Sequence, residues 1–450
     1  MTKHVDLIIN ARWLLPIIPQ NALYEDYAVV IHGGVILDVC NRSQVLTKYQ
    51  ASETIQLENH ILMPGLINLH THSAMNLMRG LADDLPLKPW LEQHIWPAEQ
   101  KFASKGFVYD GSLLACAEML SGGVTTFNDM YFYPEATIQA SLRMGVRANI
   151  GLVVMEFGTN YASDVIDYLS KGTEVRDQYK LEQSITFDFA PHAPYTVSDD
   201  TFEKVITLAE QLDIGIHTHL HETQNEIKES IDQFGLNPLA RLANLGLLGT
   251  RLTLAHCVHL SDVDQQLLAF NGCHIAHCPS SNLKLASGIA PIAECIEKGI
   301  NVGIGTDGAA SNNRLDMFSE IRLAALLAKG ASGDATAVSA HQALEMATIN
   351  GAKALGLEHK IGSVEVGKLA DLVAIKMDDL IMQPCFDPVS HLVYVASREC
   401  VSHVWVNGDL KYYKSNNSHT GLFSEIEPQE LSELASKWQS KVSAFKGTYN

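Results

Sequence analysis

Apolar, strand-like runs alternate with amphipathic helical stretches from about residue 62 onward. Near-continuous apolar strands separated by helices are typical of a parallel sheet covered by helices. Eight such units over about 240 residues match a TIM-type (β/α)8 barrel, which usually needs about 250 residues. We therefore predict an α/β fold built on such a barrel. The eight runs are GLINLHTH (65–72), VTTFND (124–129), RANIGLVV (147–154), ITFDFAPH (185–192), IGIHTHL (214–220), LTLAHC (252–257), HIAHCP (274–279) and NVGIGTD (301–307).

Six of these eight runs have a histidine or an aspartate at their last or next-to-last position. A barrel gathers the carboxyl ends of its strands at one mouth, where barrel enzymes keep their active sites. Residues far apart in sequence thus become neighbours, and the pattern predicts a site at that mouth. The six ends carry His70 with His72, Asp129, His192, His219, His256 and Asp307, and the seventh run adds His277.

Both ends of the chain have strand patterns with turns, such as Gly33-Gly34 and Asn407-Gly408. We expect them to form one composite β-sandwich domain, with the barrel between them. A helix is expected near the C-terminus, with an apolar stripe that docks onto the body or a partner subunit. The predicted boundaries are 1–62 and 365–420 for the β-sandwich domain, 63–364 for the barrel, and 421–450 for the C-terminal helix, after a polar linker at 414–421.

The formal net charge of −19 argues against polyanionic partners, so we expect no nucleic acid and no anionic membrane. No signal peptide and no apolar run of roughly 20 residues is evident, and none of the eight cysteines forms a C-x-x-C pair. These features indicate a cytoplasmic protein with reduced thiols. A homo-oligomer, either a dimer or a tetramer, is expected, although the sequence leaves the oligomeric state open.

His70 and His72 are the first candidate metal ligands. Residues i and i+2 of a strand face the same side, so both imidazoles can reach one ion. A later run, IHTHLHET, offers His217, His219 and His221, and spacing alone does not choose among them. Chemistry favours the histidine near Glu222, because water on a metal needs a nearby carboxylate to move protons.

His256 and Asp307 complete the candidate set. His256 could be a ligand, a base that orients water or a buried packing residue. Asp307 could bind the metal and accept a proton, or serve only as a turn or helix cap. Three histidines and one aspartate with open access are typical of a catalytic zinc site, whereas structural zinc sites favour four closed ligands with cysteine.

These motifs resemble the amidohydrolase superfamily. MPGLINLHTH, GVTTFND, His219-x-x-Glu222, LAHC, HCPSSNLKLASG and GTDG occur in its order over roughly residues 5–410. The chain is similar to the cytosine-deaminase and chlorohydrolase-like branch, and there to 5-methylthioadenosine/S-adenosylhomocysteine deaminases. The resemblance implies one Zn²⁺ per subunit, held by His70, His72, His219 and Asp307, with Fe²⁺ or Mn²⁺ as alternative metals. It assigns Glu222 as the proton shuttle and His256 as the residue that orients the attacking water, and the absence of a lysine at the fourth strand disfavours two metals.

Substrate candidates follow from the same resemblance. In the similar deaminases a glutamate at the place of Glu99 holds the ribose hydroxyls, and a carboxylate suits a vicinal diol. Trp90 and His192 are further candidates for substrate contact, beside Glu222 and Asp307. Members that accept S-adenosylhomocysteine have arginines after strand three, and GLVVMEFGTNYASD contains none. This departure favours the smaller, apolar 5′-methylthio group.

The sequence therefore predicts a zinc-dependent hydrolytic deaminase that converts 5′-methylthioadenosine to 5′-methylthioinosine and ammonia. A nucleoside is thus the expected small-molecule partner. The alternatives are a deaminase or chlorohydrolase for another ring (S-adenosylhomocysteine, adenosine, guanine, a pterin or a triazine). A more remote alternative is a non-catalytic scaffold of the same fold, which the presence of every expected ligand disfavours.

Overall fold

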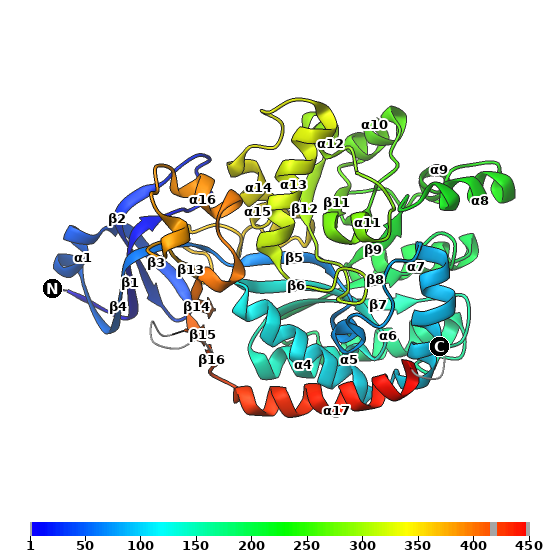
Figure 1. Cartoon of the computed structure of the whole chain (residues 1–450), viewed down its shortest axis with the longest axis horizontal. Coiled ribbons are helices and arrows are strands. Elements are labelled where there is room, and N and C mark those ends of the chain that lie inside the picture. Colours follow the sequence, from blue (N-terminus) through cyan, green and yellow to red (C-terminus); the bar gives the residue numbers. More distant parts are fainter. Residues whose placement is uncertain (1, 415–420, 447–450) are drawn as a thin grey trace.

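The computed structural model of the chain describes residues 2–414 and 421–446, and its strands form two sheets of eight strands each. In Figure 1 the sheet of the smaller domain lies at the left, and the barrel sheet lies inside a ring of helices at the right. The predicted fold class, a (β/α)8 barrel with a smaller β unit built from both chain ends, is confirmed.

The barrel strands are parallel and follow one another in sequence order around the sheet. Each of them lies within one of the eight apolar runs or extends it by at most two residues. These strands are β5 (Leu66–Thr71), β6 (Val124–Tyr131), β7 (Arg147–Val154), β8 (Ile185–Pro191), β9 (Gly215–Leu220), β10 (Leu252–His256), β11 (His274–His277) and β12 (Asn301–Ile304).

The last and the first barrel strands meet through the segment just after β12. The backbone N–H of Asp307 donates to the carbonyl of His70 at 2.9 Å. Asn68 of β5 accepts from the Thr306 backbone N–H at 2.9 Å and donates to the Thr306 hydroxyl at 2.7 Å. Gly305 permits this close approach, because a Cβ there would lie 2.8 Å from the backbone nitrogen of His70.

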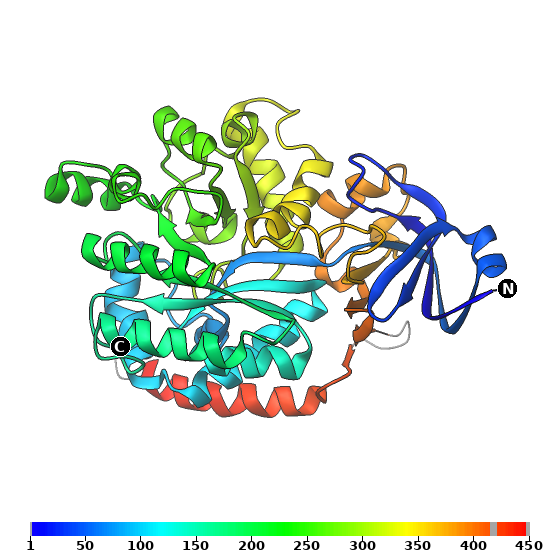
Figure 2. The same ribbon diagram turned by 180° about the vertical axis from the view of Figure 1, so that it is seen from behind.

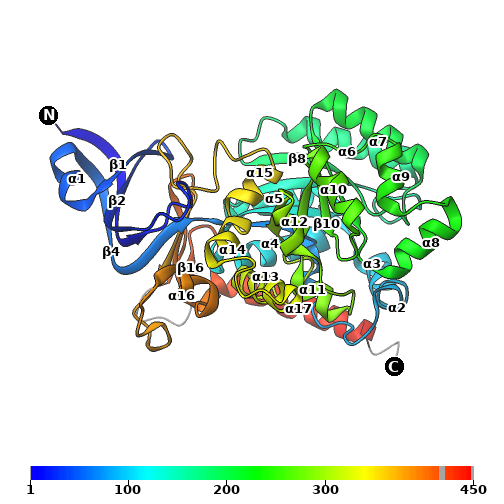
Figure 3. The same ribbon diagram turned by 90° about the horizontal axis from the view of Figure 1, so that it is seen from above.

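Helices cover the outside of the barrel, as the view from above shows (Figure 3). Their ends have the expected signals: Ser198 and Ser261 cap the starts of α7 and α10 with their side chains, and Gly272 ends α10 in the left-handed region. The helices are α4 (Lys105–Ser121), α5 (Pro134–Met144), α6 (Val165–Tyr179), α7 (Asp199–Leu212), α8 (Gln224–Phe234), α9 (Pro238–Asn244), α10 (Asp262–Asn271), α11 (Pro279–Lys284), α12 (Ile292–Glu297), α13 (Met317–Ser332), α14 (Ala340–Met346) and α15 (Ile349–Ala354).

The segment between β5 and α4 is built from short turns rather than one helix. A 3-10 turn, η1 (Ser73–Met78), follows the first metal-ligand candidates, and then come α2 (Leu87–Trp90), a π-helical turn (Leu91–Ile95) and α3 (Trp96–Phe102). Single π turns inside helices often occur at functional sites. This segment brings Trp90 and Glu99 into the pocket described below.

The sheet of the smaller domain joins the two chain ends, since β13 pairs with β4 in antiparallel register. Its strands form one continuous mixed sheet, and one face has its own core, which includes Ile9, Val29, Leu372 and Trp405. The sheet contains β1 (Lys3–Leu14), β2 (Tyr24–His32), β3 (Val35–Asn41), β4 (Tyr49–Pro64), β13 (Leu372–Lys376), β14 (Val401–Val406), β15 (Asp409–Tyr413) and β16 (Leu422–Phe423), accompanied by α1 (Arg42–Lys48), η3 (Leu380–Met382), α16 (Pro388–Tyr394) and η4 (Arg398–Cys400).

A buried ion pair connects the two sheets at the amino end of the barrel. Arg147, the first residue of β7, donates to Asp371 at 3.2 Å and to the side chain of Asn407 at 2.6 Å. Asp371 also accepts the backbone N–H of Asn407 at 2.8 Å. The domain boundaries predicted at 62/63 and 364/365 lie near the end of β4 and ahead of β13, and they remain our proposal.

The C-terminal helix α17 (Pro428–Lys446) runs along α4 (Figures 1 and 2). The indole N–H of Trp438 donates to buried Asp110 at 2.7 Å, and the Trp438 ring packs edge-on against Phe107. Near its end, Phe445 contacts Phe102 of α3 with ring centroids 5.4 Å apart. The helix therefore docks on the body, whereas residues 415–420 of the expected linker lie outside the described residues.

Among the described residues, no helix combines the length and the apolar character needed to cross a bilayer.

Candidate metal centre and its pocket

Three histidines at the barrel mouth present one nitrogen each to a common point. The ligand atoms of His70, His72 and His219 lie within 4.8 Å of one another. The Nδ1 atoms are engaged elsewhere: His72 donates to the Met130 carbonyl and His219 to the His192 carbonyl, both at 2.6 Å. This leaves Nε2 of each ring available, which is how second partners orient metal-binding imidazoles.

His70 Nε2 supplies the test of whether a metal fits. It is fully buried and has no hydrogen-bond partner, although its Nδ1 lies 3.0 Å from His217 Nε2. A buried nitrogen without a hydrogen-bond partner costs free energy unless a ligand such as a metal ion binds it. Imidazole and carboxylate ligands suit zinc, and this donor set therefore fits a zinc ion.

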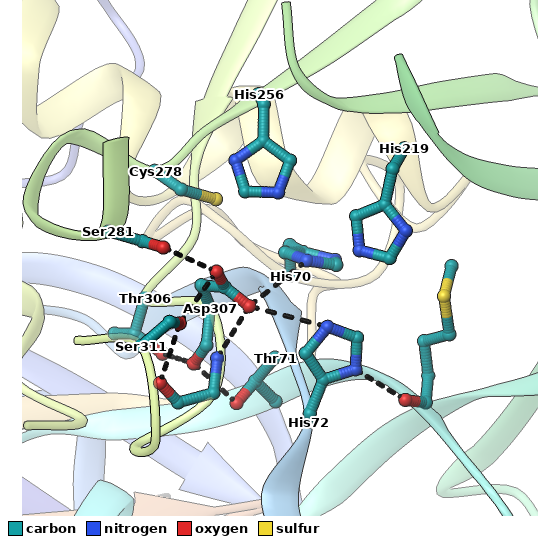
Figure 4. A network of polar contacts seen from close by, with 12 residues as sticks. His70, Thr71, His72, His219, His256, Cys278, Ser281, Thr306, Asp307 and Ser311 are labelled. Atoms are coloured by element: carbon teal, nitrogen blue, oxygen red, sulfur yellow. Dashed lines mark hydrogen bonds and ion pairs between the residues drawn. The ribbon is translucent and has the colours of Figure 1, made fainter. Parts of the chain in front are cut away.

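Asp307 joins the cluster from the segment after β12. Its Oδ1 lies 3.5 Å from His70 Nε2 and 3.3 Å from His72 Nε2 (Figure 4). Its Oδ2 accepts from the hydroxyls of Ser281 at 2.6 Å and Ser311 at 2.8 Å, which orient the carboxylate. Burial alone would raise the pKa of Asp307, but His70 and His72 hold it well below its usual value.

Several residues at this mouth have left-handed backbone conformations although none is glycine. The φ angles are 50° at His221, 72° at His256, 49° at Cys257 and 61° at Asp307. Such conformations cost of order 1 kcal/mol or more each and cluster at functional sites. They turn the chain sharply at the strand ends and, at His256 and Asp307, direct the side chain into the mouth.

Glu222 and His256 lie side by side over the histidine cluster, with 3.8 Å between Glu222 Oε2 and His256 Nε2. Burial raises the pKa of Glu222. Burial lowers the pKa of His256, but Glu222 and Asp307 outweigh it, so the net shift is upward. His256 Nδ1 donates to Asn282 at 2.8 Å, which points Nε2 at the mouth. The pair can therefore exchange protons with a molecule bound there.

Glu226 holds the backbone of Glu222 and of the residue before it. Its two carboxylate oxygens accept the N–H of Glu222 at 2.9 Å and the N–H of His221 at 3.2 Å. Burial raises the pKa of Glu226 to about 7.

A pocket opens directly above the cluster and brings together the substrate candidates Trp90, Glu99, His192, Glu222 and Asp307. Much of the remaining wall is apolar, with Met155, Phe132 and Leu285 among its residues. Of the predicted metal ligands, His70 does not line the pocket and lies beneath it. The pocket thus presents a partly aromatic, largely apolar wall to a bound ring.

Glu99 is buried in this wall beside Tyr131. Burial raises the pKa of Glu99 to about 7, and the Tyr131 hydroxyl offsets part of that rise. A carboxylate placed here can accept two hydroxyl donors from a ligand.

Trp90 and His192 differ in what they offer. The indole N–H of Trp90 already donates to the Ala82 carbonyl at 3.2 Å, so its ring supplies only an apolar wall. His192 Nδ1 lies 2.8 Å from the Thr196 hydroxyl. Burial first, and then His72, lowers the pKa of His192 to about 3, so its ring is neutral.

Other strand-end residues lie outside the ligand cluster. Of the three histidines in IHTHLHET, only His219 belongs to it, whereas His221 accepts the Leu239 backbone N–H at 3.2 Å. Asp129 accepts the Ser73 backbone N–H at 2.7 Å and supports the turn after β5. His277 is buried and belongs neither to the group of His70, His72 and His219 nor to a second possible ligand group, formed by His70, His256 and Asp307.

Sequence reasoning missed the residues that orient the cluster: Ser281, Asn282 and Ser311. The motif HCPSSNLKLASG contains two of them, but only the fold brings them to Asp307 and His256. The signal that could have identified Ser281 and Asn282 is their position at the start of α11, directly after the barrel strand β11.

Comparisons with known proteins agree with this architecture. A 5-methylthioadenosine/S-adenosylhomocysteine deaminase of Teredinibacter turnerae is 47% identical over 446 residues, covering 98% of this chain and 99% of the relative. A 5′-deoxyadenosine deaminase of Methanosarcina acetivorans is 42% identical, covering 87% of this chain and 89% of the relative. The crystal structure of an adenosine deaminase from Xanthomonas campestris with bound zinc is 42% identical and superposes with a TM-score of 0.96, covering 99% of this chain and all of that one.

The profile of the amidohydrolase family matches residues 61–411, which include every strand of the barrel and every residue of the candidate metal centre. The family motifs follow one another along the chain, and the fold brings them to one mouth of the barrel. The chain therefore belongs to the amidohydrolase family.

Proposed function

We propose that this protein is a zinc-dependent hydrolytic deaminase of adenine nucleosides, with 5′-methylthioadenosine as its best substrate. One observation carries the proposal: the cluster of three histidines and Asp307 opens, beside Glu222 and His256, into a pocket that contains the buried carboxyl of Glu99. The relatives named as deaminases and the zinc in the similar crystal structure support it. Fe²⁺ and Mn²⁺ are the alternative metals.

The reaction replaces the amino group at C6 of adenine by oxygen from water, so a C–O bond forms and the C–N bond breaks. A zinc ion held by the three histidines and Asp307 would supply Lewis-acid activation of the attacking water near neutral pH. His256 and Asp307 orient the water and take up its proton. Glu222, whose pKa burial raises, protonates a ring nitrogen and makes C6 electrophilic. A proton returned within the site lets the nitrogen leave as ammonia.

Two features of the pocket support a nucleoside with a small, uncharged 5′ group. Glu99 suits the vicinal hydroxyls of a ribose. The space beyond it is bordered by Trp96, Phe157 and the loop after β7, and no arginine lines it among the described residues. A free amino-acid carboxylate, as in S-adenosylhomocysteine, would find no cationic partner there.

A substrate comparison tests this proposal. Ammonia release should be fastest with 5′-methylthioadenosine, slower with adenosine and S-adenosylhomocysteine, and absent with guanine. Preferred turnover of guanine, a pterin or a triazine would replace the proposed substrate class with another ring. A zinc-loaded protein without turnover on any of these rings would favour the non-catalytic scaffold.

Replacing Glu222 with Gln should leave the zinc content unchanged and lower kcat by at least about 100-fold, because the proton donor to the ring is lost. Metal analysis and the loss of adenine absorbance measure the two quantities. Glu203→Gln, an exposed change in α7, is the matched control and should leave both unchanged. Full activity of the Glu222 variant would remove this residue from the proposed mechanism.

We further propose a homo-oligomer located in the cytoplasm. Light scattering of the purified protein tests the first part, and a single monomeric species would contradict it.

A further inference from the structure

A line of polar side chains occupies the interior of the barrel beneath the histidine cluster. We call His217, Asn128, Asn149 and Asp188 the inner column. They come from four different strands, β9, β6, β7 and β8, and are at most 9% exposed. The interior of such a barrel is normally filled by layers of bulky apolar residues. The inner column therefore needs an explanation that packing alone does not supply.

Short polar contacts connect the column from end to end. Asp188 accepts from the side-chain amide of Asn149 at 2.7 Å, and the same amide nitrogen donates to Asn128 Oδ1 at 3.0 Å. Asn128 Nδ2 lies 3.2 Å from His217 Nδ1. His217 Nε2 lies 3.0 Å from His70 Nδ1. The column thus ends on His70, whose Nδ1 contacts a side chain, whereas those of His72 and His219 contact backbone carbonyls.

Asn128 also contacts the backbone next to His70. Its Nδ2 donates to the carbonyl of Leu69 at 3.0 Å, one residue before His70 on β5. Asn128 therefore holds both the backbone next to His70 and, through His217, the ring. His72 and His219 need no such device, because each donates Nδ1 directly to a carbonyl.

Energetics argue that the column is retained for a purpose. Burying an amide or a carboxyl costs free energy even when its hydrogen bonds are made, and apolar replacements of similar volume are often neutral or stabilising. Thr126, also buried on β6 and two residues before Asn128, has a hydroxyl without a hydrogen-bond partner, so it isolates the packing contribution at the same face of this strand.

We propose that the inner column is a positioning element that sets the ring orientation of His70 for metal binding. It touches neither the pocket nor a ligand atom of the other histidines, and it acts only through His70. The inference depends on the metal site proposed above but not on the identity of the substrate. Partners of metal-bound histidines typically change metal affinity by about 10- to 100-fold when they are removed.

The test is the zinc affinity of Asn128→Leu, measured by competition with a chelator. We expect a loss of about 10- to 100-fold, together with a shift in the visible absorption of the cobalt(II)-substituted protein. Thr126→Val is the matched control, since it removes a buried polar group from the same face of the same strand, and it should change neither quantity. Asp188→Asn keeps an acceptor oxygen for Asn149 and should retain affinity within about threefold.

A folded Asn128→Leu protein with wild-type zinc affinity would overturn the proposal. If that variant does not fold, Asn149→Leu removes the next link, and wild-type affinity there would overturn it equally. An equal loss of affinity in Thr126→Val would show a general packing effect and would also overturn it. A wild-type protein that binds zinc but deaminates nothing would overturn only the proposed function.

Discussion

At the scale of single residues, carboxyl groups in one pocket have pKa values shifted in opposite directions. Burial raises those of Glu99 and Glu222, whereas His70 and His72 overcome burial and hold that of Asp307 well below its usual value. Groups with separated pKa values can act as acid and base at the same pH. The sequence predicted these residue types, but not their shifts, because each shift depends on neighbours from other strands.

The raised pKa of Glu99 leads to a pH-dependent KM. The group is neutral below about pH 7 and a carboxylate above it, and only the carboxylate accepts from both ribose hydroxyls. KM for 5′-methylthioadenosine should therefore fall as pH rises through about 7, as steady-state kinetics over about pH 6 to 8 would show.

Glu99→Gln should remove this dependence and raise KM about 10-fold or more, since hydrogen bonds to a charged group contribute about 1.5–3 kcal/mol. The variant should discriminate less against a 2′-deoxynucleoside. An unchanged KM for the ribonucleoside would show that Glu99 does not bind the ribose hydroxyls.

At the scale of elements, every barrel strand lies where its apolar run predicted, because a strand buried on both faces is recorded in local composition. The turns between β5 and α4 were not predicted in detail. Their conformation depends on tertiary contacts, such as the packing of Phe445 of α17 on Phe102. The closure of the barrel through Gly305 is also invisible in a local pattern.

Gly305→Ala should disturb the closure between the last and the first barrel strands. The added Cβ would meet the backbone of His70 at 2.8–2.9 Å, and neither strand can shift without moving Asp307 or His70. We expect a loss of about 1–3 kcal/mol in unfolding free energy, as for overpacking, together with weaker zinc binding. Chemical denaturation and chelator competition measure the two effects.

Gly330→Ala is the matched control, because it lies in α13 and its Cβ would meet nothing within 4 Å. It should be neutral or stabilising by up to about 1 kcal/mol. Identical behaviour of the two variants would refute the closure argument.

At the scale of the whole molecule, the strand patterns predicted a barrel and a smaller β domain but not how the two connect. The connection depends on Arg147 and Asp371, which lie 224 residues apart in sequence and are both nearly inaccessible. Nothing local marks such a pair, since either residue alone reads as a surface charge. The site itself was more predictable, because its residues stand at the ends of recognisable strands.

Asp371→Ala should lower the unfolding free energy by about 3–5 kcal/mol, because it leaves the buried charge of Arg147 without its partner. Thermal and chemical denaturation provide the measurement. Lys180→Ala breaks the exposed pair with Asp177 and should cost at most about 1 kcal/mol. Equal effects of the two changes would show that the buried pair contributes no more than a surface one.

The pairing of β4 with β13 also has a consequence during synthesis. Pro64 pairs with Leu372, so the edge of β4 stays open until the ribosome has made the intervening barrel. At about 5–20 residues per second this interval is roughly 15 to 60 s. An open strand edge invites pairing with other nascent chains. The edge of β4 is therefore a place where one nascent chain can mispair with another before β13 is made.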